Sequence, residues 1–188
     1  MNAGSLDTRH VIPLFLLFIS GLLAGCNNTS VVGDTSSRFF DMPVGSTFTL
    51  NREITILPHS TSTYVQFART GPDLRVNTYH PNCRFEVFTI SESERVVKPD
   101  VFTVTRVVNQ FEQVSLDGVR YAGPIIVADD GGPLFYNYMT TMYLESEKQP
   151  DVFRITCQMW DYIYNETYLS IDQMREAVGD VFTISIAE

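Results

Sequence analysis

The chain has 188 residues, 44% of them hydrophobic and 19% charged, and its 22 acidic residues against 13 basic ones give a formal charge of -9. This length fits one ordinary domain with a single core, and the composition excludes a wholly disordered chain. The acidic balance repels phosphate backbones, and no Lys/Arg cluster reverses it locally, so nucleic-acid binding is disfavoured.

The first 25 residues have the order of a secretory signal peptide. Arg9 and His10 precede an apolar run from Val11 to Leu23, and small residues follow it. This is the succession of basic, apolar and cleavage regions that export signals share. The apolar run falls short of the roughly 20 residues that a permanent membrane helix needs. An ordinary signal peptide or a signal anchor is the alternative.

Leu23-Ala24-Gly25-Cys26, at the end of the apolar run, resembles the lipobox of bacterial lipoproteins. In that class of protein the cysteine thiol receives diacylglycerol, a peptidase cuts before the cysteine, and in many species the new amine is acylated too, for example with palmitate. The resemblance implies that residues 1–25 are removed and that Cys26 is lipidated. Two or three acyl chains give lasting membrane attachment, because each buried CH₂ contributes about 0.8 kcal/mol.

The residues after Cys26 suggest a location and a tether. In diderm bacteria that resemble the enteric model, an aspartate after the lipidated cysteine favours the inner membrane, so Asn27 implies the outer membrane and a domain facing the periplasm. Residues 26–38 are polar and rich in Ser, Thr and Asn, which predicts a flexible tether. Residues 39–188 then form a single β-rich domain.

If Cys26 carries lipid, Cys83 and Cys157 remain as a pair in an oxidising compartment, which favours a disulfide. Each of the two falls on the apolar side of an alternating stretch, so both thiols are expected in the core. The apolar neighbours are Phe85 and Val87 for Cys83, and Phe153, Ile155 and Met159 for Cys157. Two buried free thiols are the alternative, and neither cysteine has the CxxC spacing of a metal site.

From about Phe39 onward, short β patterns alternate with turn residues. The segments are STFTLNREITIL, YVQFAR, LRVNTYHPN, RFEVFTI, VFTVTRVV, FEQVSL, VRYAG, PIIVA, FYNYMTTMYLE and VFRITCQMW. Asp117-Gly118, between FEQVSL and VRYAG, is typical of a two-residue hairpin turn. About eight to ten such segments predict a mainly β domain, an antiparallel sandwich or barrel.

One segment has the helical period instead. Ser170 and Gln173 have the spacing of a capping box, and Gly179 supplies a stop. A short helix from Ile171 to Val178 is therefore predicted, with one apolar face directed at the sheet. Its apolar face consists of Ile171, Met174, Ala177 and Val178. The segment DVFTISI then predicts a last, paired strand.

The sequence has no GxSxG, SxxK or HExxH motif and no phosphate-binding glycine loop. His59 and His80, with Asp73, could form part of a metal or acid–base site, but each histidine adjoins a proline and the spacing matches no recurrent ligand pattern. Asp129 and Asp130 could bind calcium, although the ADDGGP segment is more typical of a hairpin turn. We therefore expect no cofactor and no metal.

Aromatic residues follow the second cysteine at alternate positions. Trp160, Tyr162 and Tyr164 share one face of any strand that continues past Cys157. This face could be a platform for a glycan or a protein partner, since exposed Tyr and Trp favour interfaces. Burial of both sheet faces is the alternative.

These features favour a membrane-anchored envelope lipoprotein that acts as a non-enzymatic binding, adaptor or assembly module for an envelope protein. The alternative is a glycan- or lipid-binding or hydrolytic domain that acts on cell-envelope material. That function needs a concave site in which the Tyr and Trp side chains meet titratable groups. The candidates for those groups are Asp129, Asp130, His59 and Asp161.

Overall fold

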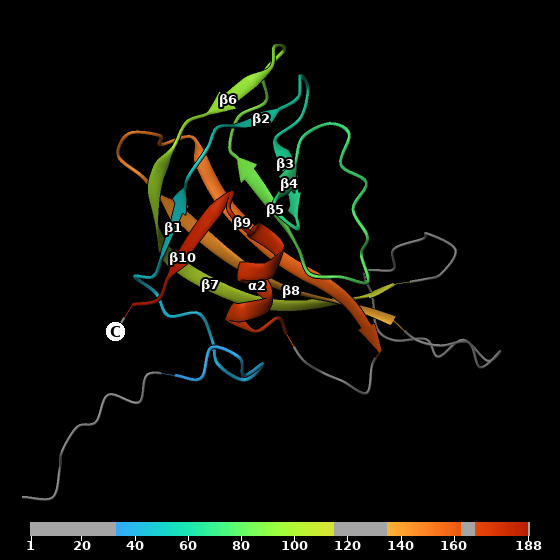
Figure 1. The fold of residues 1–188 in the computed structure, drawn as a ribbon. Helices are drawn as coiled ribbons and strands as arrows, with labels where there is room; N and C mark the ends of the chain where they lie inside the picture. Colours follow the sequence, from blue (N-terminus) through green and yellow to red (C-terminus); the bar gives the residue numbers. More distant parts are fainter. Residues whose placement is uncertain (1–32, 115–134, 163–167, 188) are drawn as a thin grey trace, which may run out of the picture. The chain divides into compact units, whose positions relative to one another are not determined.

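The computed structural model describes residues 33–114, 135–162 and 168–187, and Gly33–Glu188 form one compact unit. Within the described ranges the chain forms ten strands and one helix (Figure 1). The strands are β1 (Thr47–Leu50), β2 (Ile54–Ile56), β3 (Ser62–Gln66), β4 (Arg69–Thr70), β5 (Asn82–Val87), β6 (Arg95–Val97), β7 (Asp100–Val114), β8 (Phe135–Glu145), β9 (Val152–Tyr162) and β10 (Phe182–Ser185). The helix, α2 (Ile171–Val178), lies between β9 and β10 in the sequence.

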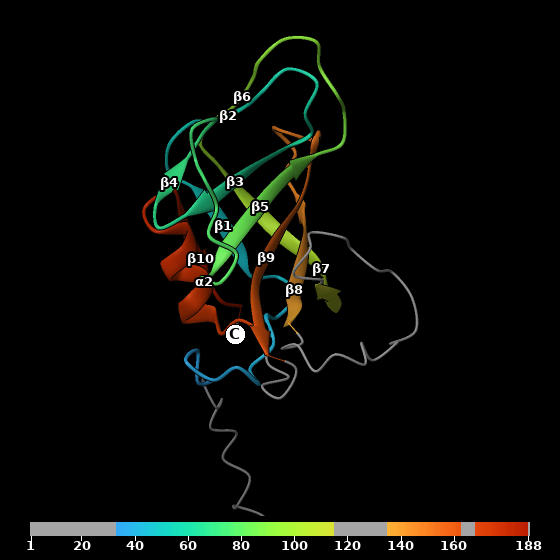
Figure 2. The same ribbon diagram turned by 90° about the vertical axis from the view of Figure 1, so that its right-hand side faces the viewer.

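Eight strands form one antiparallel sheet in the order β10-β1-β7-β8-β9-β5-β3-β4, and β2 pairs with β6 in a separate ribbon. The sheet curls (Figure 2), so that strands far apart in this order face each other. The ring of Phe85 on β5 lies 5.9 Å from that of Phe102 on β7 and 5.6 Å from that of Phe182 on β10. The predicted mainly β, antiparallel fold is confirmed, and the sheet has an inner face on the core and an outer face.

The core is built from side chains on the inner face of the sheet, on the β2–β6 ribbon and on the helix. Burying each large apolar side chain stabilises the fold by about 1.5–3 kcal/mol. The largest fully buried side chains are Phe48, Phe85, Phe102, Phe182, Leu50, Ile54, Ile56, Met142, Ile155, Ile171, Met174 and Val65. They come from both ends of the sheet, which explains why the sheet curls around them.

Helix α2 covers the inner face where the two ends of the sheet approach, because it contacts β3, β5 and β10. The predicted capping box is confirmed: the Gln173 N–H donates to Ser170 Oγ at 3.2 Å, and the Ser170 N–H donates to Gln173 Oε1 at 3.0 Å. The predicted apolar helix face is buried throughout, and the last strand, β10, pairs with β1 as expected. Among the residues that the structure describes, no helix is both long and apolar enough to cross a membrane.

Gly179 lets the end of the helix meet the tip of the β3–β4 hairpin. It has φ +52°, and a Cβ at this position would lie 2.5 Å from the Ala68 Cβ and 2.9 Å from its Cα. We expect Gly179→Ala to lower the free energy of unfolding by about 2–4 kcal/mol, because backbone strain and a clash add. Urea unfolding measures this change.

Gly71→Ala is the matched control for this prediction. Gly71 also has a positive φ, +113°, but apart from its chain neighbours no atom lies within 4 Å of the place that a Cβ would take. It should therefore show the backbone strain without the clash. Equal losses in the two variants would contradict the proposed contact between Gly179 and Ala68.

Several predicted strand boundaries are wrong. VFTVTRVV and the first four residues of FEQVSL belong to the long strand β7, whereas STFTLNREITIL is divided into β1 and β2. LRVNTYHPN lies almost wholly in a loop, since β5 begins only at Asn82. In that loop Asn77 Oδ1 accepts the Tyr79 N–H at 3.1 Å, and this local turn replaces strand pairing. The predicted hairpin turn at Asp117-Gly118 lies outside the described residues.

Cys83 and Cys157 form the predicted disulfide, with an S–S distance of 2.05 Å. They lie directly opposite each other on β5 and β9, and both are fully buried on the inner face. The prediction that Phe153 shares their face is wrong. The register changes between Glu86 and Val87, so that Val152 enters the core and Phe153 does not. Such a β-bulge inserts one residue and reverses the alternation beyond it.

Candidate functional site

The outer face of β8 and β9 carries five cross-strand pairs that change in character along its length. Their order is Tyr143 with Arg154, Thr141 with Thr156, Met139 with Gln158, Asn137 with Trp160, and Phe135 with Tyr162. The residues between them point to the opposite face, because side chains alternate along a strand. One end of this outer face is therefore aromatic and uncharged, and the other combines rings with arginine.

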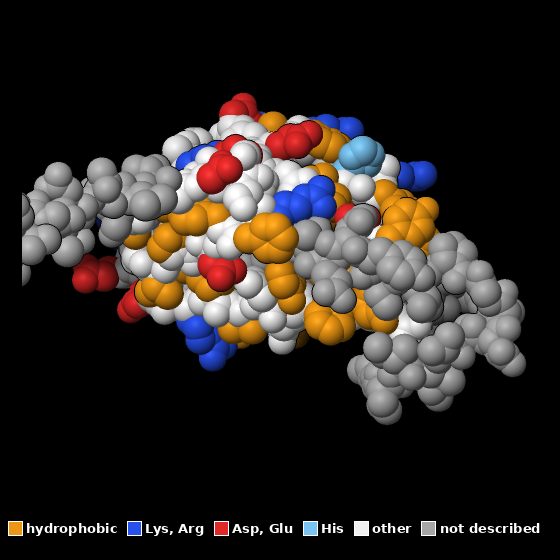
Figure 3. All heavy atoms as spheres, turned by 90° about the horizontal axis from the view of Figure 1, so that it is seen from below, with side chains coloured by type: hydrophobic (Ala, Val, Ile, Leu, Met, Phe, Trp, Pro, Cys, Tyr) orange, Lys and Arg blue, Asp and Glu red, His pale blue; other side chains and the backbone are white. Residues whose placement is uncertain are grey.

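The uncharged end carries an aromatic cluster of Tyr79, Phe135, Trp160 and Tyr162. The Tyr79 ring centroid lies 5.4 Å from that of Phe135 and 5.6 Å from that of Trp160, while Phe135 and Tyr162 are 4.6 Å apart. Tyr79 is 48% exposed and Tyr162 49% exposed, whereas Phe135 is buried. Seen from below, hydrophobic side chains lie on the side of the molecule where β8 begins and β9 ends (Figure 3).

The structure brings two of the three predicted platform residues, Trp160 and Tyr162, onto one face of β9. The third, Tyr164, lies outside the described residues. Sequence reasoning missed Tyr79, because the segment around it was predicted as a strand. The local sequence Asn77-Thr78-Tyr79 could have indicated a turn, since asparagine side chains often accept a backbone N–H two residues on.

The loop that carries Tyr79 is fixed by hydrogen bonds to buried groups. Gln66 is 3% exposed, and its amide donates to the Asn77 carbonyl at 2.8 Å and accepts the Asn77 N–H at 2.9 Å. The Trp160 N–H donates to the Thr78 carbonyl at 2.8 Å, which joins the loop to β9. The ring of Tyr79 is therefore held against the cluster before any partner arrives, which lowers the entropic cost of binding.

An amide row of Asn82, Gln158 and Asn137 runs beside the aromatic cluster. Asn137 Nδ2 donates to Gln158 Oε1 at 3.2 Å, and Gln158 Nε2 donates to Asn82 Oδ1 at 3.3 Å. Asn82 Nδ2 closes this end of the row by donating to the Gln158 carbonyl at 3.1 Å. At the other end, Asn137 Oδ1 is buried and has no hydrogen-bond partner among the described residues. The row thus ends in an unused acceptor next to Trp160.

The other end of the outer face carries an arginine–aromatic cluster of Phe88, Arg106, Tyr143, Phe153 and Arg154. The Phe153 ring lies 4.2 Å from that of Phe88 and 5.4 Å from that of Tyr143. Arg106 Cζ lies 3.8 Å from the Tyr143 ring centroid, and Arg154 Cζ lies 4.8 Å from that of Phe153. These are cation–π contacts, which hold a guanidinium flat against a ring.

Two β-bulges create the arginine–aromatic cluster. In β7 the register changes between Val104 and Arg106, so Arg106 lies opposite Tyr143 on the outer face. Simple alternation from the buried Val104 would have turned Arg106 into the core. The bulge in β9 turns Phe153 outward in the same way. Bulges commonly redirect side chains next to functional sites.

Glu86 balances part of the positive charge at this end. Arg154 Nε donates to Glu86 Oε2 at 2.7 Å and its Nη2 donates to Oε1 at 3.2 Å, while Arg84 Nη2 lies 3.4 Å from Oε2. The hydrogen bonds to Glu86 raise the pKa of Arg154 further above its ordinary value. Arg84 and Arg154 share the single carboxylate of Glu86. This end of the outer face therefore retains positive charge, although the chain is acidic overall.

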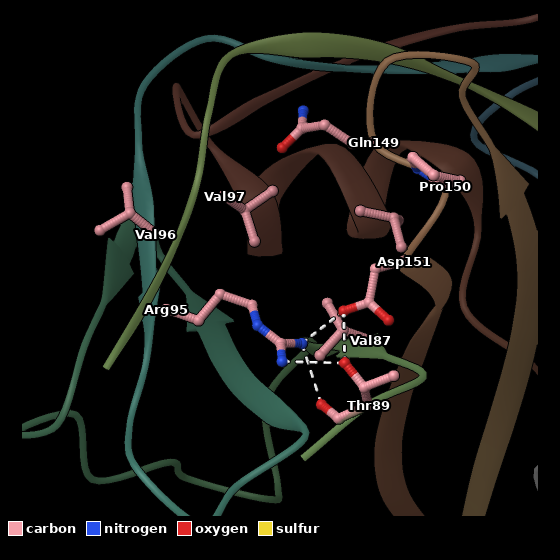
Figure 4. A pocket seen from close by; sticks show the side chains of 9 residues that line it. Val87, Thr89, Arg95, Val96, Val97, Gln149, Pro150 and Asp151 are labelled. Atoms are coloured by element: carbon pink, nitrogen blue, oxygen red, sulfur yellow. Dashed lines mark hydrogen bonds and ion pairs between the residues drawn. The ribbon is translucent and has the colours of Figure 1, made fainter. Parts of the chain in front are cut away.

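An open pocket of about 490 Å³ lies elsewhere, between the β5–β6 and β8–β9 connections. Figure 4 shows the Arg95 guanidinium directed at Asp151 and Thr89, and it forms an ion pair with Asp151 and donates to the Thr89 carbonyl at 2.9 Å. Gln149 also lines the pocket. Its Nε2 donates to the Lys98 carbonyl at 2.8 Å, and its Oε1 accepts the Lys98 N–H at 3.1 Å. The pocket is lined by Val87, Thr89, Arg95, Val96, Val97, Gln149, Pro150, Asp151 and Val152. Its two charged groups therefore neutralise each other.

Asp100, which begins β7 next to this pocket, is a buried carboxylate with several donors. Its side chain is 6% exposed and accepts from Ser146 Oγ at 2.6 Å, from the Val101 N–H at 2.8 Å and from Gln149 Nε2 at 3.3 Å. Burial alone would raise the pKa of Asp100. The hydrogen bonds and the nearby charge of Lys148 outweigh burial and lower the pKa below its ordinary value of 3.8.

We expect Asp100→Asn to lower the free energy of unfolding by about 1 kcal/mol at pH 7. Because the pKa of Asp100 is lower in the folded than in the unfolded state, its ionised form stabilises the fold above about pH 4, and this contribution is lost as the pH falls through the lowered pKa. Denaturant unfolding at pH 7 and at pH 2.5–4 should show the difference shrinking with acid. A difference between the two proteins that stays constant from pH 7 to pH 2.5 would contradict the stabilising role of the ionised carboxylate.

The titratable candidates that the structure describes have separate surroundings. His80 packs against the Phe67 ring at 5.7 Å, and the His59 N–H donates to the Ser91 carbonyl at 2.8 Å. Asp161 points to the opposite face from Trp160, and its carboxylate lies 3.7 Å from Arg38 Nη1. In the described ranges, no group of three or more His, Cys, Asp or Glu side chains could hold a metal ion. Asp129 and Asp130 lie outside those ranges.

The outer face of β8 and β9 is thus the best candidate for a functional surface. It can offer exposed rings, cation–π pairs and an unused acceptor, which serve recognition rather than proton transfer. Comparisons of the chain with protein-family models, with curated proteins and with solved structures find no match.

Proposed function

We propose that this protein is a lipid-anchored binding module of the bacterial cell envelope, attached to the outer membrane through Cys26 and facing the periplasm. In this proposal the domain is not an enzyme but an adaptor or assembly factor that recognises an envelope protein. The resemblance of residues 23–26 to a lipobox supports the anchor. The acidic chain disfavours nucleic acid as a partner.

The observation that carries the proposal is the arginine–aromatic cluster. Arginine, tyrosine and other aromatic residues are enriched at the energetic centres of protein interfaces. Here Phe88 is 59% exposed, and Ile90, two residues further along the β5–β6 connection, is 68% exposed. The two guanidinium groups already lie against rings, so little side-chain freedom is lost when a partner docks.

Photo-crosslinking in cells tests this function. A photoreactive phenylalanine analogue at position 88 should give a discrete adduct with one envelope protein. Arg106→Ala and Phe153→Ala, each made in the same background, should remove that adduct, because each takes away part of the cluster.

Arg52→Ala is the control for lost positive charge. Arg52 pairs with Asp180 at 3.2 Å, beyond the end of the helix, so its loss should leave the adduct unchanged. An adduct that survives both cluster variants would show that this surface is not the interface. Turnover of an envelope substrate by the purified protein would instead favour the hydrolytic alternative.

A further inference from the structure

We propose that the aromatic cluster and the amide row together bind a neutral glycan, an uncharged stretch of polysaccharide built from pyranose rings. This site lies at the opposite end of the outer face from the arginine–aromatic cluster. It adds a second ligand to the proposed protein-binding function and uses different residues.

The rings provide the apolar half of such a site. A pyranose has a face of C–H groups that packs on an aromatic ring, and hydroxyl groups around its rim. Tyr79 stands nearly perpendicular to Phe135 and Trp160, with interplanar angles of 82° and 76°. Tyr79 and Tyr162 are both about half exposed, so each offers an apolar ring with a polar tip, the combination that favours partly wet contacts.

The amide row provides the polar half. Asn137 is 7% exposed, and its Nδ2 donates to Gln158 Oε1. Its Oδ1 has no hydrogen-bond partner within residues 33–114, 135–162 and 168–187. A buried acceptor without a donor is rare in folded proteins and calls for an explanation. The oxygen has almost no exposed surface, so a sugar hydroxyl would pair with it after a small rotation of the Asn137 side chain. An apolar peptide on the same rings would leave it unpaired, and for this reason we favour a glycan.

The charges around the cluster select a neutral sugar. Its four members and the three amides carry no charge, whereas Glu112 on β7 lies directly opposite Asn137 and is exposed. A carboxylate at this position repels phosphorylated or uronic-acid glycans and can accept a hydrogen bond from a neutral one. An uncharged site with a carboxylate beside it therefore favours uncharged hexose or N-acetylhexosamine units.

The test uses tryptophan fluorescence, because the chain has one tryptophan and that residue, Trp160, is in the site. The processed, lipidated protein in detergent is titrated with chitotetraose, cellotetraose and maltotetraose. At least one of these should shift or quench the emission with a saturable dependence at micromolar to millimolar concentration. A tetramer of galacturonic acid, the anionic comparator, should have a much smaller effect.

Variants then assign the response to the site. Tyr79→Ala removes an exposed loop ring and should weaken binding about tenfold. Asn137→Leu removes the unused acceptor at similar volume and should also weaken it, provided that its circular dichroism matches the parent protein. Val96→Ala, at an exposed apolar side chain on the separate β2–β6 ribbon, is the control and should leave the affinity unchanged.

Three outcomes would overturn the proposal. One is the absence of any response to the three neutral tetramers, and another is a response that Tyr79→Ala leaves intact. The third is a response to a tyrosine-rich apolar peptide alone, which would assign the site to a protein. Since crosslinking at position 88 depends on the arginine–aromatic cluster, the glycan site and the proposed protein interface can each fail while the other holds.

Discussion

A Cys26→Ser variant is expected to lose membrane attachment completely. A serine hydroxyl cannot take the place of the thiol that receives diacylglycerol, so the acyl chains that would hold the protein in a bilayer are never added. In the proposed anchor, two or three acyl chains would supply most of the affinity for the bilayer, with about 0.8 kcal/mol for each buried CH₂. Fractionation should place the parent protein in the membrane pellet and the variant in the soluble fraction or as an uncleaved precursor.

Mass spectrometry of the parent protein is the second half of this experiment. It should find a chain that begins at residue 26 and carries the added mass of the acyl groups. Cys83→Ala with Cys157→Ala is the control, because it removes two cysteines without touching the lipobox and should leave the protein in the pellet. Unchanged fractionation of Cys26→Ser, with no acyl mass in the parent, would refute the anchor.

Removing the disulfide is expected to have the largest effect on stability. The bridge joins residues 74 positions apart, and closing a loop of this length in the unfolded chain stabilises the fold by about 4 kcal/mol in the loop-entropy model. The Cys83→Ala, Cys157→Ala double variant should lose about this much in urea unfolding. Alanine is preferred to serine because both positions are fully buried, where an unpaired hydroxyl would add a cost of its own.

Measurements on the reduced parent protein distinguish the effect of the cross-link from the effect of the packing of the two sulfur atoms. Unfolding and refolding it under reducing conditions removes the cross-link but keeps both side chains. The reduced parent protein should show most of the loss in free energy of unfolding that the double variant shows. A loss below about 1 kcal/mol in both samples would show that the unfolded chain gains little freedom when the bridge is absent.

The two proposals divide the outer face between two kinds of recognition. Rings that pair with arginine suit a protein surface, whereas rings beside an amide row and a carboxylate suit a sugar. Thr141 and Thr156, joined by a hydrogen bond of 3.1 Å, lie between the two ends. A lipid-anchored module with both surfaces would hold an envelope protein next to a glycan, a role typical of an adaptor.

The sequence alone determined the features whose causes are local. The helix from Ile171 to Val178 follows from a serine cap, a matching glutamine and a glycine stop within ten residues of one another. The pairing of Cys83 with Cys157 was predicted by assigning Cys26 to the lipobox, which leaves two cysteines, and by the alternation around each of them. The mainly β character follows from period-two patterns, which need no knowledge of the partner strand.

Only the tertiary structure decided which outward side chains meet. Alternation cannot foresee the bulges that turn Arg106 and Phe153 onto the outer face, because a bulge depends on how two neighbouring strands fit together. Likewise, Tyr79 reaches Trp160 because the buried Gln66 and the Trp160 N–H both hold its loop. Sequence patterns report which face of one element is apolar. A binding surface is made of contacts between elements, and their register and curvature are set by the packing of the whole core.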